Sequence, residues 1–156
     1  MAEEQQNPQM VFQIEKIYIK DLSVEVPNAP AIFLEREAPQ ISVELGTHST
    51  PIGENVYESS IKVTVSAKLG EKTVYHVECE QAGIFRIAGF PQEQLPMALG
   101  IGCPNIVFPY ARETIADVIV RAGFPPLHLA PINFEAEFML RQQQAAADAQ
   151  ARGEAH

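Results

Sequence analysis

Basic residues and tryptophan are scarce in this chain of 156 residues, which has 11 Lys and Arg against 20 Asp and Glu, and no Trp. The formal net charge of -9 argues against binding to nucleic acid or to anionic lipid, because both attract basic surfaces. It favours solubility and association with basic partners instead. The excess of acids is concentrated in residues 1–80, which hold 13 acids and 6 bases, whereas residues 81–156 hold 7 and 5.

Cysteine and long apolar runs are also scarce. With only Cys79 and Cys103, we expect buried free thiols rather than a disulfide framework. No two His lie three or four positions apart, and His76 and Cys79, which are three apart, have opposite parity on a predicted strand, so no metal site and no other cofactor is predicted. No segment approaches the roughly 20 apolar residues of a membrane span. Met1–Gln9 is polar and lacks the features of a secretory signal, so we expect a cytoplasmic location.

Motifs of catalysis are missing as well. The sequence has no G-x-S-x-G, no Gly-rich phosphate loop and no H-E-x-x-H. Cys103 and His128 could form a thiol–imidazole pair, but Cys103 lies in an apolar stretch that favours a buried thiol. We therefore predict a protein that is not an enzyme. A small-molecule-binding domain or thiol enzyme that uses Cys103 and His128 is the alternative from another functional class.

The sequence does contain clear strand periodicity. Residues 52–90 contain no proline, as expected of interior strands that need every N–H for the sheet. Residues 57–69 alternate between apolar and polar except at Ser59, Gly70-Glu71 suits a type II′ hairpin turn, and a further strand returns over residues 72–87.

The N-terminal third of the chain predicts two more strands, over residues 10–26 and residues 41–45. In residues 10–26, Met10, Phe12, Ile14, Tyr18, Leu22, Val24 and Val26 share one parity, whereas Gln13, Glu15, Asp21, Ser23 and Glu25 share the other. Ile17 and Ile19 break this alternation, which predicts a bulge or a second contact surface.

The period changes to that of a helix after Gly89. The spacing of Ile115, Val118, Ile119 and Ala122 predicts an amphipathic helix that begins between Asn105 and Pro109 and ends at Gly123. We expect Asn133 to cap a second helix. Four strands followed by helices predict an α+β fold, in which a four-stranded antiparallel sheet carries the C-terminal helices on one face.

The chain is thereby divided into three parts. Residues 1–9 are predicted to be a flexible polar N-terminus and residues 10–141 the folded domain. Residues 142–156 have no large apolar side chain, so we expect them to fray into a flexible tail.

Carboxylates gather on one parity of the first and fourth strands. Asp21 and Glu25 share a face about 13 Å apart, and Glu78 and Glu80 share the outward parity of the fourth strand. A solvated sheet face explains this pattern most simply, and an acidic face that docks a basic partner is the functional alternative.

Two long motifs point to a family. They are CPNIVFPYARE at 103–113 and FPPLHLAPINF at 124–134, and they follow Phe12-Gln13-Ile14, Tyr18 with Lys20-Asp21, Pro27-Asn28-Ala29-Pro30 and Gly83-Ile84-Phe85 in order. Over about residues 10–140 the chain resembles the SecB family of bacterial protein-export chaperones.

The resemblance implies a homotetramer, a dimer of dimers, that consumes no nucleotide. It implies a chaperone that holds unfolded preproteins in a translocation-competent state and delivers them to the SecA ATPase, whose basic, zinc-bearing C-terminal tail docks on an acidic sheet surface. The positions that match this surface are Asp21, Glu25, His76 and Glu78, of which His76 replaces a residue that is usually apolar. The positions that the family ties to tetramer integrity are Tyr75, Val77, Cys79 and Gln81.

A client chain must be gripped without regard to its sequence, so its contacts must be apolar and adaptable. The candidate residues for this grip are Ile32, Phe33, Leu34, Ile41, Val43, Leu45, Phe134, Phe138 and Met139. An alternative within the same fold is a SecB-like chaperone of another client system, such as a toxin–antitoxin pair, which would not need the acidic docking face.

Overall fold

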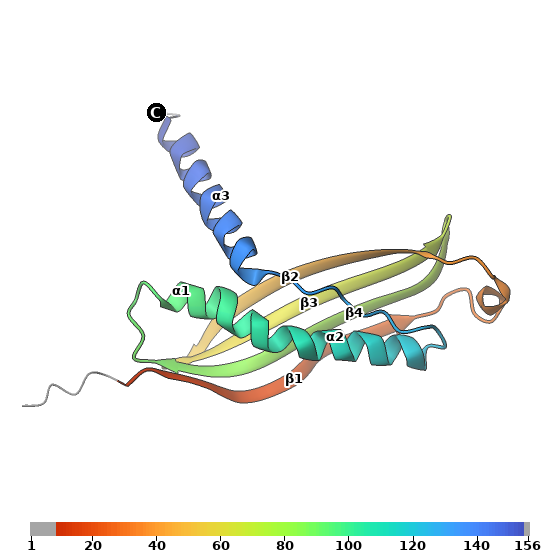
Figure 1. The fold of residues 1–156 in the computed structure, drawn as a ribbon, viewed down its shortest axis with the longest axis horizontal. Helices are drawn as coiled ribbons and strands as arrows, with labels where there is room; N and C mark the ends of the chain where they lie inside the picture. The colour runs from red at the N-terminus through yellow and green to blue at the C-terminus, as the bar shows by residue number, and fades with distance from the viewer. Residues whose placement is uncertain (1–8, 155–156) are drawn as a thin grey trace, which may run out of the picture.

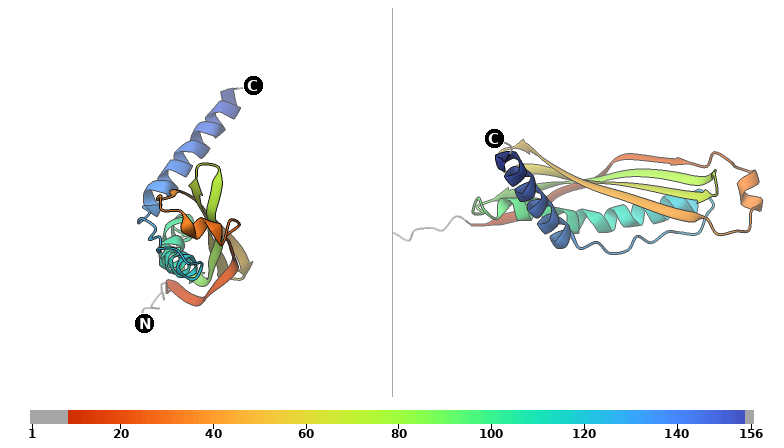
Figure 2. Two further views of the ribbon diagram at one scale, coloured as in Figure 1. Left: turned by 90° about the vertical axis from the view of Figure 1, so that its right-hand side faces the viewer. Right: turned by 90° about the horizontal axis from the view of Figure 1, so that it is seen from above.

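A computed structural model describes residues 9–154, so the predicted N-terminal segment lies almost wholly outside the described residues. Four antiparallel strands form one sheet in the order β1-β4-β3-β2 (Figure 1). Their bounds are Val11–Glu25 for β1, Gln40–Gly53 for β2, Val56–Leu69 for β3 and Lys72–Ala88 for β4. The helix α2, Cys103–Arg121, lies along one face of the sheet, as the end-on view in Figure 2 shows. The predicted α+β fold is confirmed.

The hairpin between β3 and β4 has the turn that the sequence predicts. Leu69 pairs with Lys72 across a two-residue turn, and Gly70 has the positive φ of 60° that a type II′ turn requires at this position. β2 is much longer than the predicted residues 41–45. Its second half carries Thr47, Ser49 and Pro51 on an outer strand of the sheet, so no apolar alternation marks it in the sequence.

Two bulges in β1 resolve the broken alternation of the first strand. The register shifts between Ile14 and Lys16 and again between Ile19 and Asp21. Between the shifts the parity is reversed, so Ile17 and Ile19 lie opposite Gly83 and Gln81 on the side of α2. The predicted bulge is confirmed. The parity predicted for Tyr18 is wrong, because the same reversal places it on the opposite face.

The core lies between α2 and the two central strands. Alternate residues of β3 and β4 face α2 and are completely buried, which follows from the period-2 pattern of these strands. α2 contributes buried residues at helical spacing to the same core. The fully buried core side chains include Ile61, Val63, Val65, Val77, Cys79, Phe85, Val107, Ala111, Ile115 and Ile119.

α2 begins earlier than predicted because the preceding turns lead directly into it. A short helix α1, Leu95–Met97, and a π-helical segment η2, Ala98–Gly102, precede it without a break. Pro109 therefore lies inside the helix, where it leaves the carbonyl of Asn105 without its usual N–H partner. Both residues are exposed, so water can hydrogen-bond that carbonyl.

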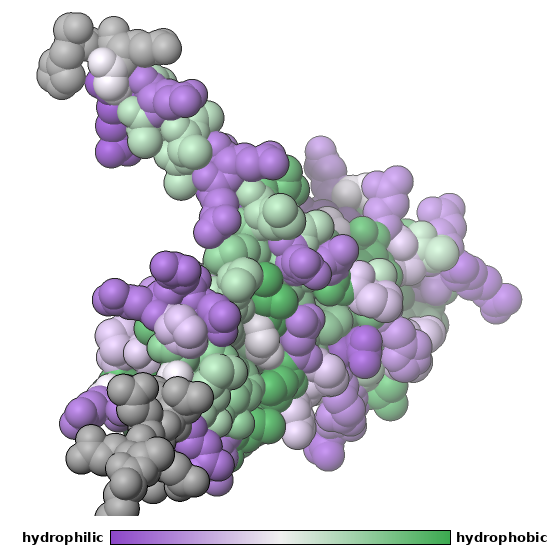
Figure 3. Space-filling model, turned by 60° about the vertical axis from the view of Figure 1, so that its left-hand side comes forward, coloured by the Kyte–Doolittle hydropathy of each residue, from purple (hydrophilic) through white to green (hydrophobic). Residues whose placement is uncertain are grey.

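The last helix, α3, runs over Phe134–Glu154. The predicted cap is confirmed, because Asn133 Oδ1 accepts a hydrogen bond of 3.0 Å from the N–H of Ala136. The predicted fraying after residue 141 is wrong, because α3 continues as a helix to Glu154. Ala, Gln and Arg are strong helix formers, so a lack of large apolar residues prevents packing but not helicity. Figures 1 and 3 show α3 projecting from the body with polar and weakly apolar residues along it.

Phe138 attaches the base of α3 to η2. A Cβ built on Gly100 would lie 2.6 Å from Cδ2 of the Phe138 ring, which is closer than atoms can approach. Gly100→Ala should therefore displace the ring and destabilise the protein by about 1–3 kcal/mol, as measured by urea denaturation. Gly102→Ala is the matched control, because its Cβ would meet only the Phe12 ring at an ordinary 3.5 Å. Equal stability of the two variants would contradict this packing.

Candidate functional site

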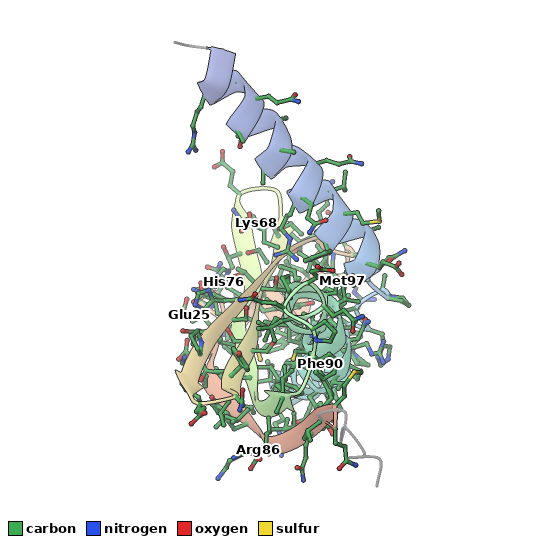
Figure 4. The ribbon with its side chains drawn as sticks, turned by 90° about the vertical axis from the view of Figure 1, so that its left-hand side faces the viewer. Glu25, Lys68, His76, Arg86, Phe90 and Met97 are labelled. Atoms are coloured by element: carbon green, nitrogen blue, oxygen red, sulfur yellow. The ribbon has the colours of Figure 1, made fainter. Side chains whose placement is uncertain are left out.

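The face of the sheet that α2 leaves uncovered, the open face, carries the predicted carboxylates. In the register of β1 and β4, Asp21 lies opposite Glu80, Ser23 opposite Glu78 and Glu25 opposite His76. Figure 4 shows Glu25 and His76 together on one side of the sheet, with Phe90 and Met97 on the other. The structure thus brings the predicted docking residues together, and we call Asp21, Glu25, Glu78 and Glu80 the acidic array.

His76 lies among these acids and is held by two contacts. Its Nδ1 lies 2.9 Å from Oγ of Ser66, and its Nε2 lies 3.4 Å from Oε1 of Glu78. Ser66 faces His76 from β3, so the imidazole is fixed from its own strand and from the neighbouring one. The ring is therefore held beside Glu78, within the acidic array.

A second polar cluster on the open face was not foreseen from the sequence. Glu58 of β3 accepts hydrogen bonds from the Tyr18 hydroxyl and from Nζ of Lys20, the latter at 2.7 Å. The small side chain of Ala82 lies opposite Tyr18 on the strand between β1 and β3. Burial and the neighbouring Glu58 raise the pKa of Tyr18 to about 12. The bulges place Tyr18 here, so the parity pattern alone could not find this cluster.

These hydrogen bonds make stability depend on pH. Hydrogen bonds from Lys20 and Tyr18 hold the pKa of Glu58 below its ordinary value of 4.5. A lowered carboxyl pKa contributes stability that is present above the unfolded value and is lost as pH falls through the folded one.

Glu58→Gln should therefore cost about 1.5–3 kcal/mol at pH 7. Its denaturation midpoint should also fall less than that of the wild type when the pH is lowered from 7 to 3. Parallel pH profiles of the two proteins would contradict the assignment.

The helix side of the sheet carries an apolar groove instead. A cavity of about 460 Å³ lies between η1 (Ala31–Leu34), β2 and the segment that follows α2, and Phe33, Ile41 and Phe124 help to line it. The Phe124 ring packs 5.0 Å from both Phe33 and Tyr75. A second cavity of about 280 Å³ shares Leu127 with the first and continues along Val43 and Leu45 to residues 128–132. We call the two together the apolar groove.

The predicted client-binding residues divide into two groups. Phe33, Leu34, Ile41, Val43 and Met139 are exposed, and Leu45 and Phe138 are half-buried. The prediction for Phe134 is corrected, because it is 2% exposed and belongs to the core, whereas Ile32 is 5% exposed and belongs to the core but also lines the first cavity. Sequence reasoning missed Phe124 and Leu127 as groove residues, although the motif at 124–134 was the signal that could have marked them.

The four residues that the resemblance predicts to matter for assembly lie inside the subunit. Tyr75, Val77, Cys79 and Gln81 are at most 3% exposed, so they form no surface that a partner could touch directly. The apolar residues that do reach the surface on this side of β1 include Ile14, Ile19, Leu22 and Val24, each 38–47% exposed.

Cys103 is unsuited to nucleophilic chemistry. Burial raises its pKa to about 12 and that of Cys79 to about 11, so neither thiol is ionised near neutral pH. Within residues 9–154, no three His, Cys, Asp or Glu side chains are grouped so that they could hold a metal ion. No helix of that region is both long and apolar enough to cross a membrane.

Comparison with known proteins agrees with this arrangement. Residues 4–145 match the family model of SecB, described as a preprotein translocase subunit. The protein-export protein SecB of Thiobacillus denitrificans is 67% identical over 135 residues, which are 86% of this chain and 89% of that protein. The SecB of Dechloromonas aromatica is 57% identical over 147 residues, 94% of this chain and 97% of that protein.

Among solved structures, the fold resembles the Rv1957 SecB-like chaperone of Mycobacterium tuberculosis, which was solved with a peptide from the HigA1 antitoxin. The TM-score is 0.63 at 19% identity, over 78% of this chain and 91% of that one. An open sheet with an acidic face, an apolar groove beside the helix and close relatives over nearly the whole chain lead to one conclusion: the chain belongs to the SecB family of protein-export chaperones.

Proposed function

We propose that this chaperone holds unfolded preproteins in its apolar groove, without ATP, and delivers them to SecA through its acidic array. The observation that carries the proposal is the separation of two unlike surfaces by one sheet. Ile41, Val43 and Leu45 of the groove lie on the helix side, whereas Asp21 and Glu78 lie on the open face. A client and a basic partner can therefore be bound at the same time.

The groove suits an unfolded chain because its lining is mainly apolar and aromatic, with Glu35, Arg36 and Glu37 as the charged residues of the first cavity. Such contacts recognise no particular sequence, and clients with different side chains can occupy the same cavities. Burying ~1,000 Å² of apolar surface gives a gross ~25 kcal/mol, most of which is offset by ordering and association. Binding of this kind holds the client by mass action and needs no nucleotide.

The acidic array suits a basic tail. Four carboxylates on neighbouring strands attract a polycation, so association should be fast and weakened by salt. Zinc would belong to the SecA tail, and Asp21, Glu25 and Glu78 would accept its basic groups. His76 lies beside Glu78, so it would modulate the docking rather than provide an apolar contact.

We further propose that the subunits assemble as a dimer of dimers in the cytoplasm. The strip of Ile14, Ile19, Leu22 and Val24 on β1 offers the apolar surface for such contacts. Tyr75, Val77, Cys79 and Gln81 would act on assembly from beneath α2, by fixing the position of that helix. Several grooves in one assembly would grip one client through effective concentration.

The docking proposal predicts that removing two carboxylates of the acidic array weakens binding of the SecA tail. A peptide with the sequence of the SecA C-terminal tail, loaded with zinc, should bind the wild type. It should bind Asp21→Ala/Glu78→Ala at least about tenfold more weakly, as measured by calorimetry. Glu54→Ala/Glu71→Ala is the matched control, because it removes two exposed acids from turns at opposite ends of the sheet.

Two results would refute this docking assignment. The wild type fails to bind the loaded peptide, or the Asp21→Ala/Glu78→Ala variant binds it as well as the control does. The first result would favour a SecB-like chaperone of another client system, which needs no acidic docking face.

A further inference from the structure

Gln81 is a buried polar side chain that joins three elements. It lies on the helix side of β4 and is 3% exposed. Its Nε2 donates a hydrogen bond of 3.2 Å to the carbonyl oxygen of Tyr18 on β1. Its Oε1 accepts one of 3.1 Å from the hydroxyl of Thr114 on α2. Because an amide buried without partners is costly, these two bonds fix Gln81 between the helix and the edge strand.

The bond to Tyr18 lies beside the second bulge of β1. Ile19 pairs with Gln81 and Asp21 pairs with Glu80, so Lys20 between them has no partner on β4. A bulge disturbs the backbone hydrogen bonds around it, and the amide of Gln81 supplies a donor there. Without Lys20 as the extra residue of this bulge, the register of the following part of β1 would shift by one position.

Such a slip would dismantle the acidic array. Successive residues of a strand face opposite sides, so Asp21 and Glu25 would turn toward α2 and Leu22 would turn to the open face. On the open face, Tyr18 and Lys20 are tied to Glu58. Residues on both sides of the sheet therefore hold the same bulge, and Gln81 does so from the side of the helix.

We propose that Gln81 is a positioning residue, which couples α2 to the bulge in β1 and thereby sets the register that presents Asp21 and Glu25 in the acidic array. The proposal rests on the proposed docking function and extends it to a residue that cannot touch the docked partner. A shift of α2 would therefore be transmitted to the open face through the side chain of Gln81.

The test replaces Gln81 with an apolar side chain of similar size. Gln81→Met should weaken binding of the zinc-loaded SecA tail peptide by at least about fivefold, although the substitution lies on the opposite face. Tyr18 should then titrate nearer its ordinary pKa of 10 than the value of about 12 in the wild type. This titration is followed by NMR with ring-labelled tyrosine, assigned through Tyr18→Phe. Sedimentation in parallel separates the effect from a change of assembly.

Wild-type affinity in Gln81→Met would overturn the proposal, and so would an unchanged Tyr18 titration. If that variant does not fold, Thr114→Val, which frees only the end of Gln81 at α2, should weaken binding by at least about twofold, and no change would again overturn it. If the wild type does not bind the peptide, the docking proposal fails, and the Tyr18 titration alone still tests whether Gln81 holds the bulge.

Discussion

Replacing Ile41 and Val43 together with aspartate should abolish client holding while leaving the protein folded. Both side chains lie in the apolar groove and are 45% and 46% exposed, so the isolated subunit tolerates a charge at either position. A bound client would cover both carboxylates, and desolvating unpaired charges is strongly unfavourable. The affinity for an unfolded preprotein should fall at least about a hundredfold.

Suppression of aggregation of a denatured preprotein after dilution measures this loss. The matched control is Ile52→Asp/Met97→Asp, which places two carboxylates at exposed apolar positions that do not line the groove. The control should protect the client as well as the wild type does. If the Ile41/Val43 variant also protects it, the client is held elsewhere.

Truncation of Phe85 should have the largest effect on stability. Its ring is completely buried, lies 5.8 Å from the Phe12 ring and covers Gly83, whose missing Cβ leaves room for it. Phe85→Ala should cost about 3–5 kcal/mol, which is much of the stability of a domain of this size. Urea denaturation with an unchanged m-value would measure it.

Phe33→Ala provides the comparison for Phe85→Ala. It removes the same atoms from a ring that is 48% exposed and packs against Phe124, so its cost in stability should be about 1 kcal/mol. It should, however, weaken client binding, since Phe33 lines the groove. Equal losses of stability in the two variants would contradict the packing described for the core.

The sequence predicted the regular parts of the fold because local rules decide them. The alternation in β3 and β4, the glycine at the hairpin turn and the Asn133 cap each depend on residues close together in the chain. The acidic array followed from the same rule, since a strand of known parity assigns Asp21 and Glu25 to one face.

What could not be predicted depends on partners distant in the chain. The broken alternation at Ile17 and Ile19 predicted a bulge, but the positions of the two register shifts, and with them the parity of Tyr18, depend on the pairing with β4. Ile32 and Phe134 are apolar in the same way as Phe33, and only the packing of the core distinguishes them. The groove forms because β2 and residues 124–132 lie side by side. The motif at 124–134 is distinctive in the sequence, but it does not indicate this contact.

Simultaneous binding tests most directly the claim that one sheet separates client from partner. The wild-type chaperone is saturated with an unfolded preprotein that has no acidic or basic cluster, and the zinc-loaded SecA tail peptide is then titrated into the complex. Because the groove and the acidic array lie on opposite faces, the peptide should bind with a Kd within about twofold of that for the free chaperone, and the client should stay bound. Displacement of the client by the peptide, at concentrations where both bind alone, would contradict the account.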